Sequence, residues 1–404
     1  MRLLPLGLVA AQSEYYFQHW CGAYYLPMLD DANCAKTFPS DLTRGECPVP
    51  VLTSVPSGYV ADTALDRIQV DTSRLSHVTG ADVCIVMTKR VNINGKVRPY
   101  NKYFCNSSAA ANTAYETWSS SKVFAAANAG SNMRKGSPTC SSGRFGLDAK
   151  VWGKNGYTQL ADLVTAVVAY DETAGYSSNG LSAYFHDIGG RDSMNSLVKS
   201  PWLGQSQNSL GGNYGESVPY DLGLTFIDEY GEACVVSRDN PSQVYPNSLT
   251  LLAQSELLRR LVQHNIVDEG VQWPNLEARD LEQILYGADE TGLFGSQQWG
   301  GMTADTAIYL QNSLNMPEVE RLSGGSWRIY SKLGAGYSSS RRVGEIITLA
   351  YGCFPDLLND RENFEFTVAV RGSVANDSFL FNAEQRVKDA MDRTIQAVWE
   401  GRLN

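Results

Sequence analysis

A serine and a lysine three positions apart stand at the start of a helical stretch of this chain. Ser119 and Lys122 precede the apolar run 123–127, and this spacing places both side chains on one helix face, one turn apart. A lysine whose pKa is lowered can take the proton of a serine hydroxyl. Backbone amides at a helix N-terminus can stabilise an oxyanion beside that hydroxyl. The pair therefore has the composition of a nucleophile and its base.

A lone Ser-x-x-Lys pattern arises by chance in a serine-rich chain, and Ser196 with Lys199 is a second copy. Such a match is most simply a solvated helix start. Two further segments favour Ser119: residues 177–179 read Ser-Ser-Asn, and residues 332–334, which end a predicted strand, read Lys-Leu-Gly. Because Ser196 comes after the Ser-x-Asn segment, Ser119 is the copy that heads the order Ser-x-x-Lys, Ser-x-Asn, Lys-x-Gly.

These three motifs, in this order, resemble those of the class A β-lactamases, within the superfamily of β-lactamases and penicillin-binding proteins. The closest stretch is 327–336, which is similar to the family's strand carrying Lys-Thr-Gly-Ala-Gly, and Arg341 stands where the family has an arginine. Residues 188–190, Ile-Gly-Gly, are a second resemblance. The likeness extends from about residue 60 to the end of the chain.

The resemblance implies a role for each matching residue. Ser119 would be the acylated nucleophile, and Lys122 would be its general base or proton relay. Ser177 would pass the proton to the leaving nitrogen, and Asn179 would contact the substrate amide or hold Lys122. Lys332 would supply positive charge beside Ser177.

The same resemblance implies how a substrate would be held. The backbone amides of Ser119 and Ala335, with Gly334 beside them, would form the oxyanion hole, and Arg341 would bind a substrate carboxylate. The family's threonine is Leu333 here, so one hydroxyl for that carboxylate is missing. Either Arg341 compensates for it, or the natural substrate lacks the carboxylate.

The base that activates the deacylating water has no matching motif. Class A enzymes carry it in Glu-x-x-Leu-Asn, and this sequence has no such segment. Glu216 lies close to the family's distance beyond Ser177, although its surroundings, Gly-Gly-Asn-Tyr-Gly-Glu-Ser, do not match. Glu216 is the candidate, and deacylation is the step that the sequence defines least.

Simpler interpretations stay open for several of these residues. Lys332 could be an exposed strand end, Arg341 a surface charge, and Asn179 with Gly180 a turn. We interpret the aromatic residues of the middle region as packing residues rather than a substrate platform: Trp202, Tyr214, Tyr220, Trp273 and Trp299.

Composition narrows the classes of function. The chain has 404 residues, 43% of them hydrophobic and 19% charged, which is an ordinary globular balance. Its net charge of −10 argues against nucleic acid as a partner, and no apolar run is long enough to span a membrane. The four histidines lack the spacing of zinc ligands, and no glycine-rich phosphate loop is present. We therefore predict no metal and no cofactor, and a small-molecule or peptide-like substrate; oligomeric state stays open.

A strand hairpin is predicted before the serine and lysine. Residues 81–88 and 97–104 have strand patterns and are joined at Asn94-Gly95, the strongest short signal of a hairpin turn. In that register Cys84 faces Cys105, either as a disulfide or as two buried thiols.

Helical patterns fill the middle of the chain, and strands return at its end. Leu160, Leu163, Val164, Val167 and Val168 recur with helical spacing. Further helices are predicted at 255–261, 276–285 and 303–314, and strands at 327–332, 344–351 and 364–370. A closing helix has Asn382 as its predicted N-cap and an apolar face made of Val387, Met391, Ile395 and Val398.

This order of elements predicts an α/β fold, an α+β sandwich. An antiparallel sheet from both ends of the chain is flanked by helices and encloses an inserted all-helical region, at about 116–320. The distance from Ser-x-Asn to Lys-x-Gly exceeds that of ordinary class A enzymes, so this region is expected to carry an insertion that includes Cys234. We divide the chain into residues 1–60, a signal peptide and cysteine-containing extension, and 61–404, a β-lactamase-like catalytic domain.

Cysteine usage and the N-terminus favour a secreted or periplasmic protein. Eight cysteines are many for a reducing cytosol, and the first three, Cys21, Cys34 and Cys47, fall in a segment expected to be stapled by disulfides. The first 11 residues have the pattern of a short signal peptide, or else form a buried first strand. Two Asn-x-Ser sequons, at Asn106 and Asn376, also fit export.

Taken together, the sequence predicts a serine hydrolase that acts through an acyl-enzyme at Ser119, with β-lactamase-like hydrolysis of a β-lactam or related amide. A D,D-peptidase or esterase on the same scaffold is the first alternative. A non-catalytic or single-turnover penicillin-binding sensor domain is the second.

Overall fold

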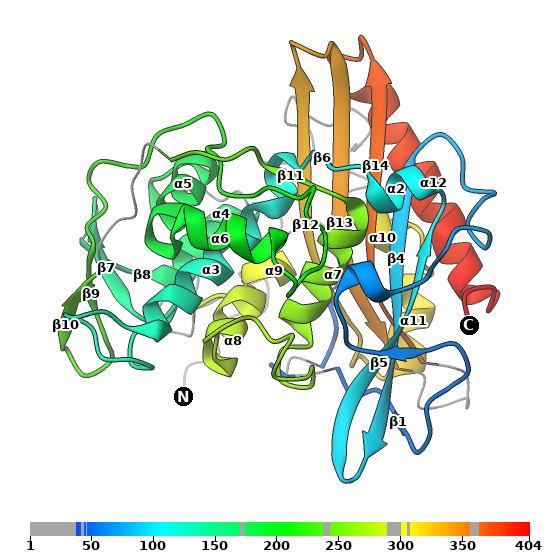
Figure 1. Ribbon diagram of the computed structural model, residues 1–404, viewed down its shortest axis with the longest axis horizontal. Coiled ribbons are helices and arrows are strands. Elements are labelled where there is room, and N and C mark those ends of the chain that lie inside the picture. The colour runs from blue at the N-terminus through cyan, green and yellow to red at the C-terminus, as the bar shows by residue number, and fades with distance from the viewer. Residues whose placement is uncertain are drawn as a thin grey trace, which may run out of the picture.

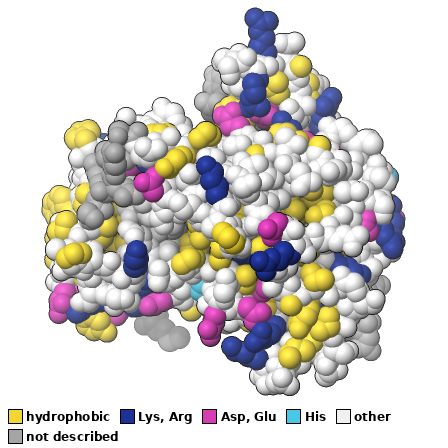
Figure 2. All heavy atoms as spheres, in the orientation of Figure 1, with side chains coloured by type: hydrophobic (Ala, Val, Ile, Leu, Met, Phe, Trp, Pro, Cys, Tyr) yellow, Lys and Arg dark blue, Asp and Glu magenta, His cyan; other side chains and the backbone are white. Residues whose placement is uncertain are grey.

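The computed structural model describes residues 38–41, 44–45, 47–154, 156–169, 174–236, 243–288, 300–304, 308–355 and 363–404. The predicted signal peptide, Cys21, Cys34 and Trp299 lie outside these residues. No helix within the described ranges is long and apolar enough to cross a membrane. On the face shown in Figure 2, the described Lys and Arg side chains are scattered and form no continuous basic surface.

The central element is one sheet made from both ends of the chain, as predicted (Figure 1). Its long strands are antiparallel neighbours, and short strands complete its edges. The strand order is β12 (Arg328–Ser338), β13 (Val343–Phe354), β14 (Phe364–Ala375), β4 (Asp82–Ile93), β5 (Lys96–Cys105) and β2 (Val60–Ala61), with β1 (Val51–Leu52) beside β4 and β3 (Val70–Asp71) beside β5.

The predicted hairpin forms between β4 and β5. Asn94 and Gly95 connect the strands with positive φ values of 55° and 82°, a conformation that these two residue types adopt more easily than others. Cys84 pairs with Cys105 in the register expected from that turn. The two form a disulfide, which settles the choice between a bridge and two thiols.

One face of the sheet packs against α12 (Phe381–Trp399). The four predicted apolar residues of this helix, Val387, Met391, Ile395 and Val398, are all buried. The predicted N-cap is wrong: the helix begins at Phe381, and its N-cap is Leu380. The carboxylate of Asp377 accepts a hydrogen bond from the Ala383 amide at 2.8 Å, so an acidic residue upstream caps the first turn in place of Asn382.

The opposite face of the sheet packs against a block of helices (Figure 1). Every predicted helix has a counterpart there or beside it, although the one expected at 303–314 is described as two helices on either side of residues 305–307. The helices on this face are α2 (Ser108–Asn112), α3 (Lys122–Lys135), α4 (Leu160–Ala169), α5 (Ser178–Gly189), α6 (Arg191–Lys199), α7 (Leu251–Val262), α8 (Ala278–Tyr286) and α9 (Gly301–Ala304). Two further helices, α10 (Ile308–Asn312) and α11 (Met316–Ser323), lie on the other face of the sheet with α12.

The inserted region is mostly rather than entirely helical, because it contains a second, four-stranded sheet. This sheet lies at the far side of the helices from the large sheet (Figure 1). Cys234 in β10 bonds to Cys140, which follows α3, so the insertion is fastened to the helical block. The strands run in the order β10 (Ala233–Val235), β9 (Thr225–Ile227), β7 (Lys150–Gly153) and β8 (Gly156–Gln159), and a separate pair joins β6 (Tyr115–Glu116) to β11 (Ser248–Leu249).

The aromatic residues of the middle region differ in their burial. Trp273 is buried and packs edge to face with Trp202, with ring centroids 5.7 Å apart, as expected of packing residues. Tyr220 is 98% exposed, so it does not pack as predicted; it lies in the loop between α6 and β9. Asn106, in the first sequon, uses its side-chain amide to bond the backbone at Val78, Ala81 and Val83.

Candidate active site

Ser119 lies in a short 3-10 turn, η2 (Trp118–Ser121), that leads directly into α3. Of the three consecutive serines, Ser119 is half-buried, whereas Ser120 and Ser121 are buried. The Ser120 hydroxyl oxygen lies 2.7 Å from the Thr117 carbonyl oxygen and 2.8 Å from the Gln254 side-chain amide. The Ser121 hydroxyl is 3.0 Å from the Tyr214 hydroxyl. The two buried serines therefore fasten the turn, and Ser119 is the one that keeps access to solvent.

Lys122 begins α3 and is completely buried. Its ammonium donates to the Ser178 hydroxyl at 3.0 Å and to the Asn179 side-chain carbonyl at 2.6 Å. Burial lowers the pKa of Lys122 well below its usual range; the nearby charge of Lys332 lowers it further, and the carboxylate of Glu216 acts in the opposite direction. The neutral amine that a general base needs is thereby favoured.

Close packing of α3 against α5 sets the position of Lys122 relative to the Ser-x-Asn segment. A Cβ on Gly189 would lie 2.9 Å from the Ala129 backbone nitrogen, so only glycine permits this approach. The Asn128 side chain donates to the Gly189 carbonyl at 2.7 Å, and Asn132 donates to Ile188 at the same distance. The second resemblance noted in the sequence, Ile-Gly-Gly, thus marks the contact between these helices.

Residues 177–179 form the start of α5 and face Lys122. Ser177 is the N-cap and accepts a hydrogen bond from the Gly180 amide, so Asn179 belongs to a helix start and not to an isolated turn. Ser178 is buried and donates to the Val167 carbonyl of α4 while accepting from Lys122. Sequence reasoning missed Ser178, because the motif treats its position as variable.

Glu216 reaches the same place from a loop between α6 and the second sheet. The Ser177 hydroxyl donates to one oxygen of its carboxylate, and the Asn179 amide donates to the other at 3.3 Å. Glu216 is exposed on its other side. A carboxylate chosen from chain distance alone is therefore bonded to two residues of the Ser-x-Asn segment.

Lys332 approaches from the large sheet. It is buried on β12, and its ammonium donates to the Val168 carbonyl at 2.9 Å. This carbonyl is at the C-terminal end of α4, where the helix dipole favours a cation. Lys332 is thus not an exposed strand end. Leu333 points to the other face, as the alternation of a strand requires, and is buried in the core beside α12.

Gly334 brings β12 against the start of α3. A Cβ there would lie 2.6 Å from the Ser120 amide nitrogen, 2.7 Å from the Thr117 carbonyl and 2.9 Å from the Ser119 amide nitrogen. Strand and turn therefore touch backbone to backbone. Ala335, the next residue on the strand, is partly exposed, and its pairing with the Ser119 amide in an oxyanion hole stays a prediction.

Arg341 is in the turn between β12 and β13 and is bonded to two carboxylates. Its guanidinium donates to Glu116 at 2.5 Å and to Glu345 at 2.6 Å, and its Nε donates to Ser338 at 3.2 Å. It is thus neither an isolated surface charge nor an open receptor for a substrate carboxylate. The role implied for it by resemblance stays a prediction.

Tyr214 is a site residue that the sequence did not mark as functional. Its ring centroid is 5.3 Å from the Lys122 ammonium, and the ring stacks on that of His186 with centroids 6.0 Å apart. It precedes Glu216 by two positions, so it anchors the loop that carries this carboxylate. In the sequence, only the closeness of Tyr214 to Glu216 could have indicated its place in the site.

The second Ser-x-x-Lys copy, Ser196 and Lys199, is exposed on α6.

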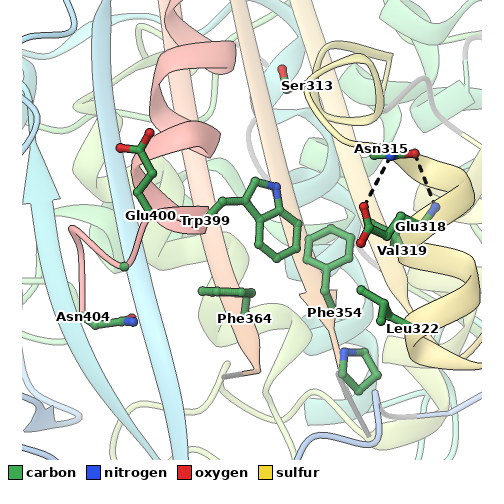
Figure 3. A pocket seen from close by; sticks show the side chains of 12 residues that line it. Ser313, Asn315, Glu318, Val319, Leu322, Phe354, Phe364, Trp399, Glu400 and Asn404 are labelled. Carbon is green, nitrogen blue, oxygen red and sulfur yellow. Dashed lines mark hydrogen bonds between the residues drawn. The ribbon is translucent and has the colours of Figure 1, made fainter. Parts of the chain in front are cut away.

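A separate cavity of about 660 Å³ lies on the other side of the large sheet, between α11 and the end of α12 (Figure 3). Its wall is aromatic, with Phe354, Phe364 and Trp399. The polar pair at its rim, Asn315 and Glu318, caps the first turn of α11. None of the predicted site residues lines it. Because the predicted nucleophile, base and motif residues meet elsewhere, the candidate site is the cluster around Lys122.

No protein-family model and no curated protein matches the sequence. Among solved structures, the chain is similar in fold to β-lactamases, several of which are described as class A. The TLA-3 extended-spectrum β-lactamase matches at 14% identity with a TM-score of 0.44, over 81% of this chain and 94% of that one. A β-lactamase from Xanthomonas campestris matches at 12% and 0.42, over 81% and 96%. Carbapenemase VCC-1 from Vibrio cholerae matches at 13% and 0.41, over 81% and 98%.

Proposed function

We propose that this chain is a serine hydrolase that forms an acyl-enzyme at Ser119 and hydrolyses a β-lactam or a related amide or ester. The observation that carries the proposal is the environment of Lys122. A buried ammonium, one turn after a half-buried serine, is bonded to Ser178 and Asn179 and lies within the electrostatic reach of Lys332 and Glu216. Four segments that are distant in the sequence, at 119–122, 178–179, 216 and 332, therefore meet there.

In the acylation step, the Ser119 hydroxyl oxygen attacks the substrate carbonyl carbon, and its proton passes to the neutral amine of Lys122. The oxyanion that forms on the carbonyl oxygen is stabilised by the amides of Ser119 and Ala335. Collapse of the intermediate breaks the bond to the leaving atom. The proton held by Lys122 is returned to that atom through Ser177. A positioned base of this kind contributes about a hundredfold or more.

In the deacylation step, water attacks the ester carbonyl of the acyl-enzyme and gives its proton to Glu216. Ser177 and Asn179 hold this carboxylate at the site through hydrogen bonds. When the ester bond breaks, the Ser119 oxygen takes up the proton held by Glu216, which restores the hydroxyl and the carboxylate, and the acid product leaves. Because Glu216 is bonded to the Ser-x-Asn segment itself, repeated turnover is favoured over a sensor that is acylated once.

An esterase or D,D-peptidase on the same scaffold is the second candidate, and one observation favours it. Leu333 is buried in the core, and Arg341 is paired with two glutamates. The two positions that would hold a substrate carboxylate in the class A pattern therefore do not present free groups for it. For both candidates we propose a secreted or periplasmic location, supported by three disulfides among the described residues.

The test compares the wild type with Ser119→Ala and with Ser196→Ala, the matched control from the second Ser-x-x-Lys copy. A chromogenic cephalosporin and a nitrophenyl ester are the substrates, and intact mass reports covalent adducts. We expect Ser119→Ala to lose at least about a thousandfold in kcat/KM and to form no adduct, and Ser196→Ala to behave as wild type. Turnover of the ester alone supports the esterase, and one equivalent of stable adduct supports the sensor. Full activity of Ser119→Ala refutes the proposal.

A further inference from the structure

The guanidinium of Arg341 is occupied by protein carboxylates on two sides. Glu116 and Arg341 are partly exposed, at 44% and 40% of their side chains, and Glu345 is fully buried. Charge-assisted hydrogen bonds to a guanidinium are among the strongest that side chains make. A substrate carboxylate would have to displace one of these partners, and only the exposed Glu116 can yield to it.

The wider cluster is negative. Glu345 also accepts hydrogen bonds from Arg371 and from the Trp118 indole nitrogen, and Arg371 is paired with Asp82 at 2.8 Å. Two guanidinium groups thus face three carboxylates, Glu116, Glu345 and Asp82. The cluster therefore has no spare positive charge with which to attract an anion.

This cluster lies beside the nucleophile. Glu116 precedes Ser119 by three residues, and consecutive Cα atoms are 3.8 Å apart, so the two Cα atoms are within about 11 Å. Trp118, adjacent to Ser119, bonds to Glu345, and a Cβ on Gly336 would overlap its ring. The pair of Arg341 and Glu116 therefore borders the place where a substrate must lie to acylate Ser119.

We propose that Glu116 is a specificity-determining residue: by pairing with Arg341 it directs the site towards acyl donors that lack a carboxylate, namely neutral amides or esters. This inference rests on the proposed function and names its substrate class. Glu116 acts through Arg341, so it is a positioning residue. The carboxylates of this cluster repel an anionic acyl donor, whereas they do not repel a neutral acyl donor.

The test uses matched acid and neutral substrates. One pair is a chromogenic cephalosporin and its methyl ester, and the other is nitrophenyl hydrogen succinate and nitrophenyl butyrate. The readout is the ratio of kcat/KM for the acid to kcat/KM for the neutral partner. We expect Glu116→Gln to raise this ratio about tenfold, because the freed Arg341 can bond the acid. The gain should vanish in Glu116→Gln/Arg341→Gln.

The control is Glu318→Gln on α11. Glu318 has the same exposure as Glu116, 44%, and also pairs with an arginine, Arg321, but it lies away from the site. This variant makes the same change in net charge and should leave the ratio as in wild type.

Three outcomes overturn the inference: Glu116→Gln leaves the ratio unchanged, the double variant keeps the gain, or the control shows the same gain. Failure of the proposed function is recognised separately. If none of the four substrates acylates Ser119 by intact mass, the proposed function fails and this inference with it. If Ser119 is acylated but the ratio does not respond to Glu116, only this inference fails.

Discussion

Gly334 of β12 touches the backbone at Ser119, so that a Cβ on the glycine would lie 2.9 Å from the serine's amide nitrogen. Sheet and helix thereby meet without an intervening side chain. The amide that follows Gly334 on the strand and the amide of Ser119 can then be held in one fixed arrangement. In acyl transfer, such preorganised donors supply much of the rate enhancement.

The first prediction concerns this contact. Gly334→Ala must displace β12 from η2, since the Cβ meets backbone atoms that cannot rotate away. We expect a loss of about 2–3 kcal/mol in the free energy of unfolding and a loss of about a hundredfold in the acylation rate. Urea unfolding and time-resolved intact mass measure the two. Gly270→Ala is the control, because a Cβ there meets nothing within 4 Å; equal effects of both substitutions would contradict the argument.

The second prediction concerns the charges around Lys122. Acylation needs its neutral form, so the rate falls as pH drops through the pKa of Lys122. Lys332 lowers this pKa and Glu216 raises it. Lys332→Met should therefore move the acidic limb of the acylation rate to higher pH, and Glu216→Gln should move it to lower pH.

Single-turnover acylation rates against pH measure both shifts, independently of deacylation. Lys199→Met, at the exposed end of α6, is the control for loss of a positive charge. It should not change the pH at which the acylation rate falls. Shifts in the same direction in the two test variants would show that Lys122 is not the base.

The third prediction concerns the ring of Tyr214, which lies over the Lys122 ammonium. Tyr214→Phe keeps that ring and its stacking on His186, whereas Tyr214→Leu removes the ring that lies over the Lys122 nitrogen. We expect the Phe variant to stay within about threefold of wild type. The Leu variant should accumulate acyl-enzyme, because Glu216, two residues on, loses its anchor. Intact mass during steady-state turnover detects this species, and similar behaviour of the two variants would count against the role.

The fourth prediction concerns stability and pH. Burial, reinforced by the nearby charge of Arg191, lowers the pKa of His186 to about 3. Below its ordinary pKa of about 6.5, the unfolded chain binds a proton there that the folded chain excludes. Stability should therefore fall as pH drops from about 6.5 towards 3. His186→Phe should remove this part of the loss, by roughly 3 kcal/mol near pH 4.5.

Urea unfolding of wild type and variant across this pH range gives the difference between the two curves. Parallel curves for wild type and His186→Phe would contradict the assignment.

The sequence predicted best what depends on local periodicity and turn chemistry. Asn94-Gly95 set the register that pairs Cys84 with Cys105, and the apolar face of α12 is buried as expected. It could not predict contacts that depend on distant packing. The pairing of Arg341 with Glu116 joins residues far apart in the chain, and nothing in either segment marks the other as its partner.

The N-cap of α12 and the strands of the inserted region were likewise not predicted from the sequence. Asn382 has the right residue type for an N-cap, but Asp377 reaches the first turn from upstream. The second sheet, β7 to β10, was not expected in a region of helical patterns, because its strands are only three or four residues long. Such short strands leave too little alternation to recognise.

The disulfide between Cys47 and Cys353 joins the start of the described chain to the C-terminal end of β13. In a reducing cytoplasm both thiols would stay unbonded, and the segment around Cys47 would have no covalent link to β13. Recombinant production should accordingly be directed to an oxidising compartment, and preparations from the two routes should differ in resistance to proteolysis near residue 47.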